Sequence, residues 1–160
     1  MRSAKSQRPK AKSAFLLRDY ELRDFDALLA LDRACFAEGI AYSERELSAF
    51  LHRRGSFTVV AEGPRGQVAG FVIAHVQRTY GWIITIDIAE SARRHRLGTL
   101  LMEEAEQRLR AAGVTAIVLE VAVDNLAAIT FYKRLGYSVM RTLPRYYLDS
   151  LDAFQMAKQL

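Results

Sequence analysis

The stretch ITIDIAESARRHRLG, residues Ile84 to Gly98, decides the fold of this 160-residue chain. It begins as a β-branched apolar run, which predicts a strand, and the residues after it open a helical pattern. A helix N-terminus presents free backbone N–H groups and the positive end of a dipole. The order of strand, basic loop and helix therefore predicts a phosphate or pyrophosphate site, and a solvated loop is the alternative. Four basic residues form this loop: Arg93, Arg94, His95 and Arg96.

The length and composition predict one globular domain, over residues 15–160, behind a basic leader at residues 1–14. Of all residues, 51% are hydrophobic and 26% are charged, which is typical of a folded soluble protein. The single cysteine, Cys35, cannot form an intrachain disulfide and fits a reducing compartment. The apolar runs are far shorter than the roughly 18 residues of a membrane span. We therefore expect a cytoplasmic protein.

The leader holds the whole excess of positive charge. Removing its five cations from the 23 basic residues of the chain leaves 18, which equals the number of acidic residues. The net charge of +5 therefore says little about nucleic-acid binding by the domain. We expect the leader to be disordered, and an arm that contacts the ribosome, RNA or an acidic partner is the alternative. The five cations are Arg2, Lys5, Arg8, Lys10 and Lys12.

Short-range signals predict seven strands and four helices. The spacing of apolar residues and turn signals places strands at residues 15–18, 57–61, 68–76, 82–88, 114–123, 137–142 and 153–158. Asp24, Ser43 and Asn125 are expected to cap three helices, and the helix after the basic loop should end at Gly113. A chain reversal is expected at residues 80–81.

The region from residue 82 to residue 123 reads as strand, helix and strand, which implies a right-handed crossover between two parallel strands. The second of these strands is almost continuously apolar, which predicts a strand covered on both faces. Tight turns join the strands at residues 57–61, 68–76 and 82–88, which should be antiparallel, and LPRYYLDSL joins the two closing strands. The sequence thus predicts an α/β (α+β) fold with a mixed, mostly antiparallel sheet and helices on both faces.

Residues 84–99 resemble motif A of the GCN5-related N-acetyltransferase (GNAT) superfamily, whose pattern is Q/R-x-x-G-x-G/A at the start of the central helix. Here the pattern reads RRHRLG over residues 93–98, so Gly98 matches and Arg96 replaces the first glycine. Glycine lacks a Cβ and tolerates unusual dihedral angles. We therefore expect a negative φ at Arg96, whose side chain would then pair with phosphate itself.

A second resemblance lies in LEVAVDNLAAITFYKRLGY, residues 119–137, which is similar to the GNAT signature N-x-x-A-x-x-x-Y-x-x-x-G-F/Y. The matching residues are Asn125, Ala128, Tyr132, Gly136 and Tyr137. The resemblance implies a GNAT-like sheet in which the one parallel strand pair is splayed and acetyl-CoA binds in the gap. It implies the following cofactor-binding residues: Ile86, Asp87, Ile88, Arg93, Arg94, His95, Arg96, Leu97, Gly98, Thr99, Asn125 and Tyr132.

The chemistry of acetyl transfer to an amine needs a base, an oxyanion site and an acid. An α-amino group, with a pKa of about 7.7 to 8, needs only a modest base. Glu120 is the one acid in the run IVLEVAV and is the candidate base, with a solvent-facing position as the alternative. Backbone N–H groups of residues 86–88 are candidates for the oxyanion site. Tyr132 is the candidate acid, although its helical spacing also fits a residue of the core. For Asn125 the alternative to a cofactor contact is a simple helix cap.

Within the superfamily, the LEV strand, the second signature and RYYLDSLDAFQM most resemble N-acetyltransferases of the RimI type, which modify ribosomal-protein alanine, and related N-terminal acetyltransferases. That resemblance implies that Glu120 is the general base and Tyr132 the general acid. It implies that Tyr146 and Tyr147 enclose the acceptor N-terminus, with sheet-edge packing as the alternative. Phe36 and Tyr42, between the first two helices, should face them.

Three functions follow from these residues. The first is transfer of an acetyl group from acetyl-CoA to the N-terminal α-amino group of a protein, such as a ribosomal protein. The second is acetylation of lysine or a small amine on the same fold, because acceptor choice lies in variable loops. The third is CoA binding without catalysis, which the arginine at position 96 and the basic leader suggest. The histidines show no ligand spacing, so we expect no metal site.

Overall fold

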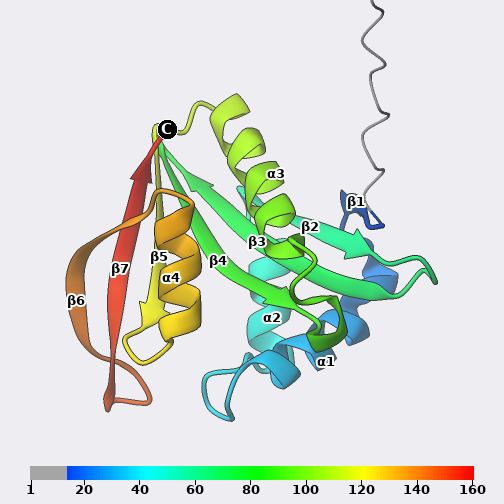
Figure 1. Cartoon of the computed structure of the whole chain (residues 1–160), viewed down its shortest axis with the longest axis horizontal. Helices are drawn as coiled ribbons and strands as arrows, with labels where there is room; N and C mark the ends of the chain where they lie inside the picture. The colour runs from blue at the N-terminus through cyan, green and yellow to red at the C-terminus, as the bar shows by residue number, and fades with distance from the viewer. Residues whose placement is uncertain (1–13) are drawn as a thin grey trace, which may run out of the picture.

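A seven-stranded mixed sheet organises the protein, as seen in a computed structural model that describes residues 14–160 (Figure 1). The predicted leader, apart from Ala14, lies outside the described residues. The strand order is β1-β2-β3-β4-β5-β7-β6, and every neighbouring pair is antiparallel except β4 and β5. The strands are β1 (Leu16–Asp19), β2 (Ser56–Glu62), β3 (Val68–Gln77), β4 (Tyr80–Ile88), β5 (Ala116–Ala122), β6 (Ser138–Tyr147) and β7 (Leu151–Gln159).

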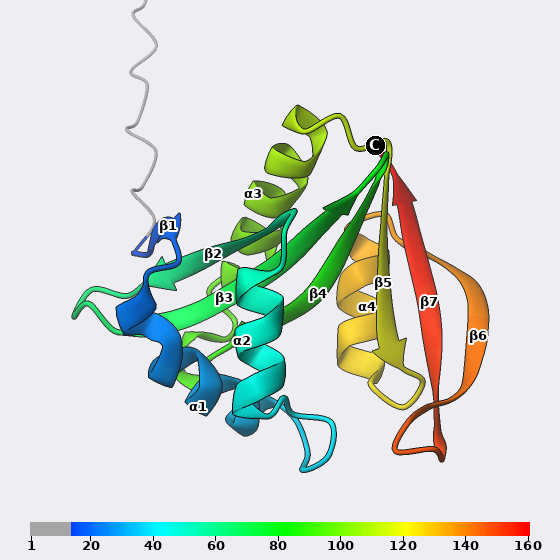
Figure 2. The ribbon, with the colours of Figure 1, turned by 180° about the vertical axis from the view of Figure 1, so that it is seen from behind.

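Two pairs of helices cover opposite faces of the sheet, which confirms the predicted fold class. Helices α1 and α2 lie against β2 to β4 on one face, and α3 and α4 lie on the other (Figures 1 and 2). Two short 3₁₀ turns, η1 and η2, precede α1 and α3. The helices and turns are η1 (Leu22–Asp24), α1 (Phe25–Cys35), α2 (Glu44–His52), η2 (Glu90–Ala92), α3 (Leu97–Ala111) and α4 (Leu126–Arg134).

Local capping signals set most helix ends. The Ser43 side chain accepts a hydrogen bond from the backbone N–H of Glu46, and the Glu46 carboxylate accepts one from the N–H of Ser43. The third helix ends before Gly113, which has a φ of +84°. The prediction for Asp24 was wrong. Its carboxylate makes no cap to α1, because both oxygens accept hydrogen bonds from the Arg18 guanidinium at 2.8 and 2.9 Å.

Three further predictions were wrong in detail. The reversal before β4 occurs at residues 78–79, so Tyr80 and Gly81 already belong to the strand. Strand β6 continues to Tyr147 instead of ending at residue 142. Strand β5 is not covered on both faces: Ile117, Leu119 and Val121 are buried, whereas alternate residues on the other face are half-exposed. Helices α1 and α2 do not reach over that part of the sheet (Figure 2).

The parallel strands β4 and β5 separate soon after they meet. They pair only at residues 80–82 of β4 with residues 116–118 of β5. Beyond that point the two strands diverge, and α4 lies behind the opening in Figure 2. The predicted splay is therefore present, and it exposes the edges of both strands to a shared gap.

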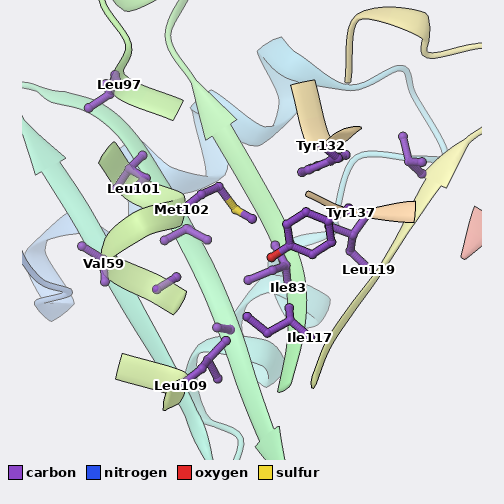
Figure 3. Close-up of a cluster of buried hydrophobic side chains, with 14 of the residues drawn as sticks. Val59, Ile83, Leu97, Leu101, Met102, Leu109, Ile117, Leu119, Tyr132 and Tyr137 are labelled. Carbon is purple, nitrogen blue, oxygen red and sulfur yellow. The ribbon is translucent and has the colours of Figure 1, made fainter. Parts of the chain in front are cut away.

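A hydrophobic core lies between the sheet and α3, beside this gap. Leu101, Met102 and Leu109 of α3 are completely buried against strands β2 to β5 (Figure 3). Tyr132 of α4 and Tyr137 complete the cluster beside β5, and Figure 3 shows their rings between α4 and Leu119. Burial of a large apolar side chain stabilises a fold by roughly 1.5 to 3 kcal/mol.

Candidate active site

The gap between β4 and β5 presents free backbone donors. The N–H of Ala89 donates to the carbonyl of Ala69 at 2.8 Å, on the β3 side of the strand. Hydrogen-bonding direction alternates along an antiparallel strand, so Asp87 also faces β3, while Ile86 and Ile88 direct their N–H groups into the gap. These donors fit a thioester carbonyl and the amide-rich arm of CoA, as expected for the implied co-substrate.

The basic loop before α3 has an unusual backbone, and the expected negative φ at Arg96 is wrong. Arg96 has a φ of +58° and Arg94 a φ of +66°, both in the left-handed region. A residue with a Cβ is disfavoured there, and glycine is not. The loop needs this turn because α3 begins at the next residue, Leu97, whose side chain is buried in the core.

We expect Arg96→Gly to stabilise the protein by about 1 kcal/mol, because glycine relieves the left-handed strain. Acetyl-CoA affinity should be retained, since the N–H groups of the loop stay in place. Thermal unfolding and calorimetric titration with acetyl-CoA measure the two effects. Arg93→Gly is the matched control, because Arg93 has a φ of −66° and gains nothing from glycine. A large loss of affinity in Arg96→Gly alone would instead make its side chain a phosphate ligand.

The side chains of the basic loop do not all point one way. All four are exposed, but Arg93 turns back to donate to the carbonyl of Ile88 at 3.3 Å. It also lies 3.8 Å from the sulfur of Cys35, whose thiol in turn contacts the Ile88 carbonyl. His95 stacks edge-on with the ring of Phe15. Arg94 and Arg96 therefore remain the side chains best placed to meet a phosphate at the start of α3.

Helices α3 and α4 meet where the two sequence signatures lie. A Cβ built on Gly98 would lie 3.2 Å from the ring of Phe131, so glycine permits close contact between the helices. Thr99, half-buried, follows in the first turn of α3. Asn125 caps α4, because its side-chain oxygen accepts a hydrogen bond from the N–H of Ala128 at 3.2 Å. The predicted cap is present, and the predicted cofactor contact of Asn125 stays a prediction.

Glu120 and Tyr132 approach the gap from opposite faces of the sheet. Glu120 alternates with the buried residues of β5 and so faces the open side, where it accepts a hydrogen bond from the amide of Gln155 at 3.2 Å. Tyr132 is 8% exposed on the α4 side. Burial, with the nearby Asp87 and Tyr147, raises the pKa of Tyr132 and keeps its hydroxyl protonated.

Aromatic side chains surround the open side of the gap. The rings of Tyr146 and Tyr147 meet edge to face, with centroids 4.8 Å apart. Burial, the neighbouring Tyr146 and the charge on Glu120 together raise the pKa of Tyr147 to about 12. Tyr42 is close enough to both tyrosines for their charges to raise its pKa further, beyond the effect of burial. The structure thus brings these three together, while Phe36 ends α1 half-buried.

Two loops meet at the end of the sheet where β4 and β5 are furthest apart (Figures 1 and 2). A Cβ built on Gly39, between α1 and α2, would lie 2.5 Å from Cδ2 of Leu148, in the turn between β6 and β7. The Tyr42 hydroxyl donates to the carbonyl of Ile84 at 3.3 Å and fixes the first loop to β4. The approach to Glu120 is therefore bounded by protein on two sides.

Sequence reasoning placed Asp87 among the cofactor-binding residues and missed that its buried side chain pairs with Asp32 behind the gap. Asp32 of α1 and Asp87 of β4 are both fully buried, and each carboxyl lies close enough to the other to shift its pKa. Burial raises the pKa of Asp87 to about 8 and also raises that of Asp32. A signal was present, since each is a lone acid within an apolar pattern. Their partnership was hidden because the two positions lie far apart in the sequence.

The described residues show neither a metal-binding group nor a membrane-spanning helix. Across residues 14–160, no group of three or more His, Cys, Asp and Glu side chains could hold a metal ion. In the same part of the chain, none of the helices has the length and hydropathy needed to cross a bilayer.

Comparison with known proteins gives a consistent result. The family model described as the Acetyltransferase (GNAT) family matches residues 22–137. N-alpha-acetyltransferase 30 of Schizosaccharomyces pombe is 34% identical over 119 residues, which cover 71% of this chain and 79% of that protein.

Two solved structures share the arrangement of the sheet and helices. Ard1 from Thermoplasma volcanium has a TM-score of 0.84 at 26% identity, with 92% of this chain and 98% of that chain covered. The ribosomal-protein-S18-alanine N-acetyltransferase from Escherichia coli has a TM-score of 0.80 at 26% identity, with 91% and 93% covered. Family match, relatives and splayed sheet agree: this chain belongs to the GNAT family and is an acetyl-CoA-dependent N-acetyltransferase.

Proposed function

We propose that this enzyme acetylates the N-terminal α-amino group of a protein, with ribosomal proteins among the candidate acceptors. The observation that carries the proposal is the approach to Glu120, which lies beside Tyr42, Tyr146 and Tyr147 and is bounded on two sides by touching loops. Such an approach suits the end of an extended chain, which is narrow, better than a lysine in the middle of a folded surface. The names of the Schizosaccharomyces pombe and Escherichia coli relatives support the same acceptor class.

The proposed mechanism divides the proton transfers between two faces of the sheet. Acetyl-CoA, bound in the gap, supplies a thioester carbonyl that a neutral amine can attack. Glu120 accepts the proton that the amine loses, directly or through a water, and Gln155 orients its carboxylate. The N–H groups of Ile86 and Ile88 stabilise the developing negative charge on oxygen. Tyr132 donates a proton to the departing sulfur, and its raised pKa ensures that the proton is present.

The acceptor class is tested with paired peptides. We expect transfer to a peptide that has a free N-terminus and no lysine, and no transfer to a lysine-bearing peptide with a blocked N-terminus, because an α-amino group loses its proton far more easily than lysine. Mass spectrometry of the products locates the acetyl group. Transfer to the blocked peptide would replace the proposal by lysine acetylation. Acetyl-CoA binding without transfer to either peptide, or to a panel of small amines, would leave a non-catalytic CoA-binding protein.

The ribosomal part of the proposal has its own test. Peptides that copy the N-termini of ribosomal proteins should be acetylated with a higher kcat/KM than sequence-shuffled peptides of equal length. Equal rates for the two sets would remove the ribosomal acceptor while leaving N-terminal acetylation intact.

A further inference from the structure

The buried carboxyls of Asp32 and Asp87 link the two halves of the substrate site. Oδ2 of Asp32 accepts the backbone N–H of Tyr42, in the loop between α1 and α2, at 2.6 Å. Oδ1 of Asp87 accepts the hydroxyl of Thr85 at 2.7 Å. Among the described residues no N–H or O–H group donates to the remaining oxygens, Oδ1 of Asp32 and Oδ2 of Asp87, although both atoms are buried.

Two buried carboxyls that lie this close are stable only if they share a proton. Two carboxylates near enough to shift each other's pKa repel each other, and burial makes that repulsion and the loss of hydration costly. One proton held between them turns the repulsion into a charge-assisted hydrogen bond. The pair therefore joins α1 and its following loop to the end of β4 only while it keeps that proton.

The pair lies next to both the gap for acetyl-CoA and the approach of the acceptor. Asp87 lies between Ile86 and Ile88, whose N–H groups face the gap for acetyl-CoA. Asp32 accepts a hydrogen bond from the backbone N–H of Tyr42, whose ring lines the approach of the acceptor. Building on the proposed function, we propose that Asp32 and Asp87 are positioning residues. Their shared proton fixes the loop between α1 and α2, here called the acceptor loop, relative to the acetyl group. Neither side chain touches substrate, because both are fully buried.

The titratable groups around the pair keep their charge near neutral pH, so the pair itself is the group that titrates there. Arg33 and Glu46 act on Asp32 from α1 and α2. Cys35, Tyr42 and Tyr132 lie near Asp87, and burial raises the pKa of each, so they stay neutral. Raising the pH through the alkaline pKa of Asp87 removes the shared proton, and the acceptor loop should then separate from β4.

The kinetic test follows the KM for a peptide acceptor from about pH 6 to about pH 9 at saturating acetyl-CoA. We expect the ratio of the wild-type KM to the KM of Asp87→Asn to rise about tenfold from neutral to alkaline pH, because only the wild-type pair loses a proton, and the titration of the acceptor amine affects both proteins equally. In Asp87→Asn the amide N–H donates to Asp32 at every pH, and the amide oxygen still accepts from Thr85. Asp26→Asn, an exposed change on α1, should keep the wild-type profile. A ratio that is independent of pH would overturn the proposal.

A second measurement needs no substrate and separates this inference from the proposed function. Hydrogen exchange of the Tyr42 amide, corrected for intrinsic rate, should show protection that falls about tenfold over the same pH range in the wild type and stays constant in Asp87→Asn. Constant protection in the wild type would reject the pair even if peptides are acetylated. Falling protection in a protein that acetylates no peptide would support the shared proton of Asp32 and Asp87 but reject the proposed N-terminal acceptor. Should Asp87→Asn fail to fold, Asp32→Asn replaces it, because its amide N–H would donate to the Asp87 carboxylate at every pH.

Discussion

Replacing Glu120 by glutamine is expected to lower kcat by about 10²- to 10⁴-fold, the contribution typical of a general base. Glutamine keeps the size of the side chain and can still contact Gln155 on β7, so the strand should stay in place. What it lacks is the ability to take the proton of the amine. Acetyl-CoA affinity should change little, because Glu120 faces the side of the sheet opposite to α3 and α4.

The Glu120→Gln experiment combines steady-state kinetics with calorimetric titration of acetyl-CoA. Activity of the variant should recover partly at high pH, where more of the amine is neutral without help. Glu44→Gln, in the exposed first turn of α2, is the matched control and should retain full activity. A variant that is folded but loses acetyl-CoA binding and turnover equally would contradict the role of a base.

The second large effect is expected for Tyr132→Phe, which removes only a hydroxyl. We expect kcat to fall by about 10²-fold, because the sulfur then leaves without its proton donor. The ring contacts with Phe131 and Tyr137, at centroid distances of 5.3 and 5.9 Å, should persist. Stability and acetyl-CoA affinity should therefore stay close to those of the wild type.

A change of leaving group sharpens the test of Tyr132. An acetyl thioester of a more acidic thiol needs less protonation, so the difference between wild type and Tyr132→Phe should shrink with it. Tyr80→Phe is the control, since Tyr80 is 51% exposed at the far end of β4. An undiminished difference with the acidic thiol would assign the effect of Tyr132 to packing instead of proton transfer.

Features encoded by neighbouring residues were predictable from the sequence. The capping box of Ser43 and Glu46 sets the start of α2, and Gly113 sets the end of α3, as expected. The splayed strand pair followed from the family resemblance, since the crossover between residues 82 and 123 only required the strands to be parallel. Motif and periodicity thus located the gap and the basic loop, and with them most of the candidate site.

Features that depend on distant partners were not predictable. Asp24 looks like a helix cap in its local sequence, but Arg18 on β1 occupies its carboxylate. The left-handed Arg96 is imposed by the buried position of Leu97, which fixes where α3 begins. The contact between Asp32 and Asp87 depends on how α1 packs on β4, which no short pattern encodes.

The last strand of the sheet order, β6, has one side on which no strand of residues 14–160 lies, and most of its residues are exposed. Such an edge invites pairing with another chain, which leads to aggregation. Pro144 lacks an N–H to offer, Arg141 and Arg145 add like charges, and two register shifts interrupt the regular ladder. The same strand that brings Tyr146 and Tyr147 to the acceptor is thus built to resist self-association at high concentration.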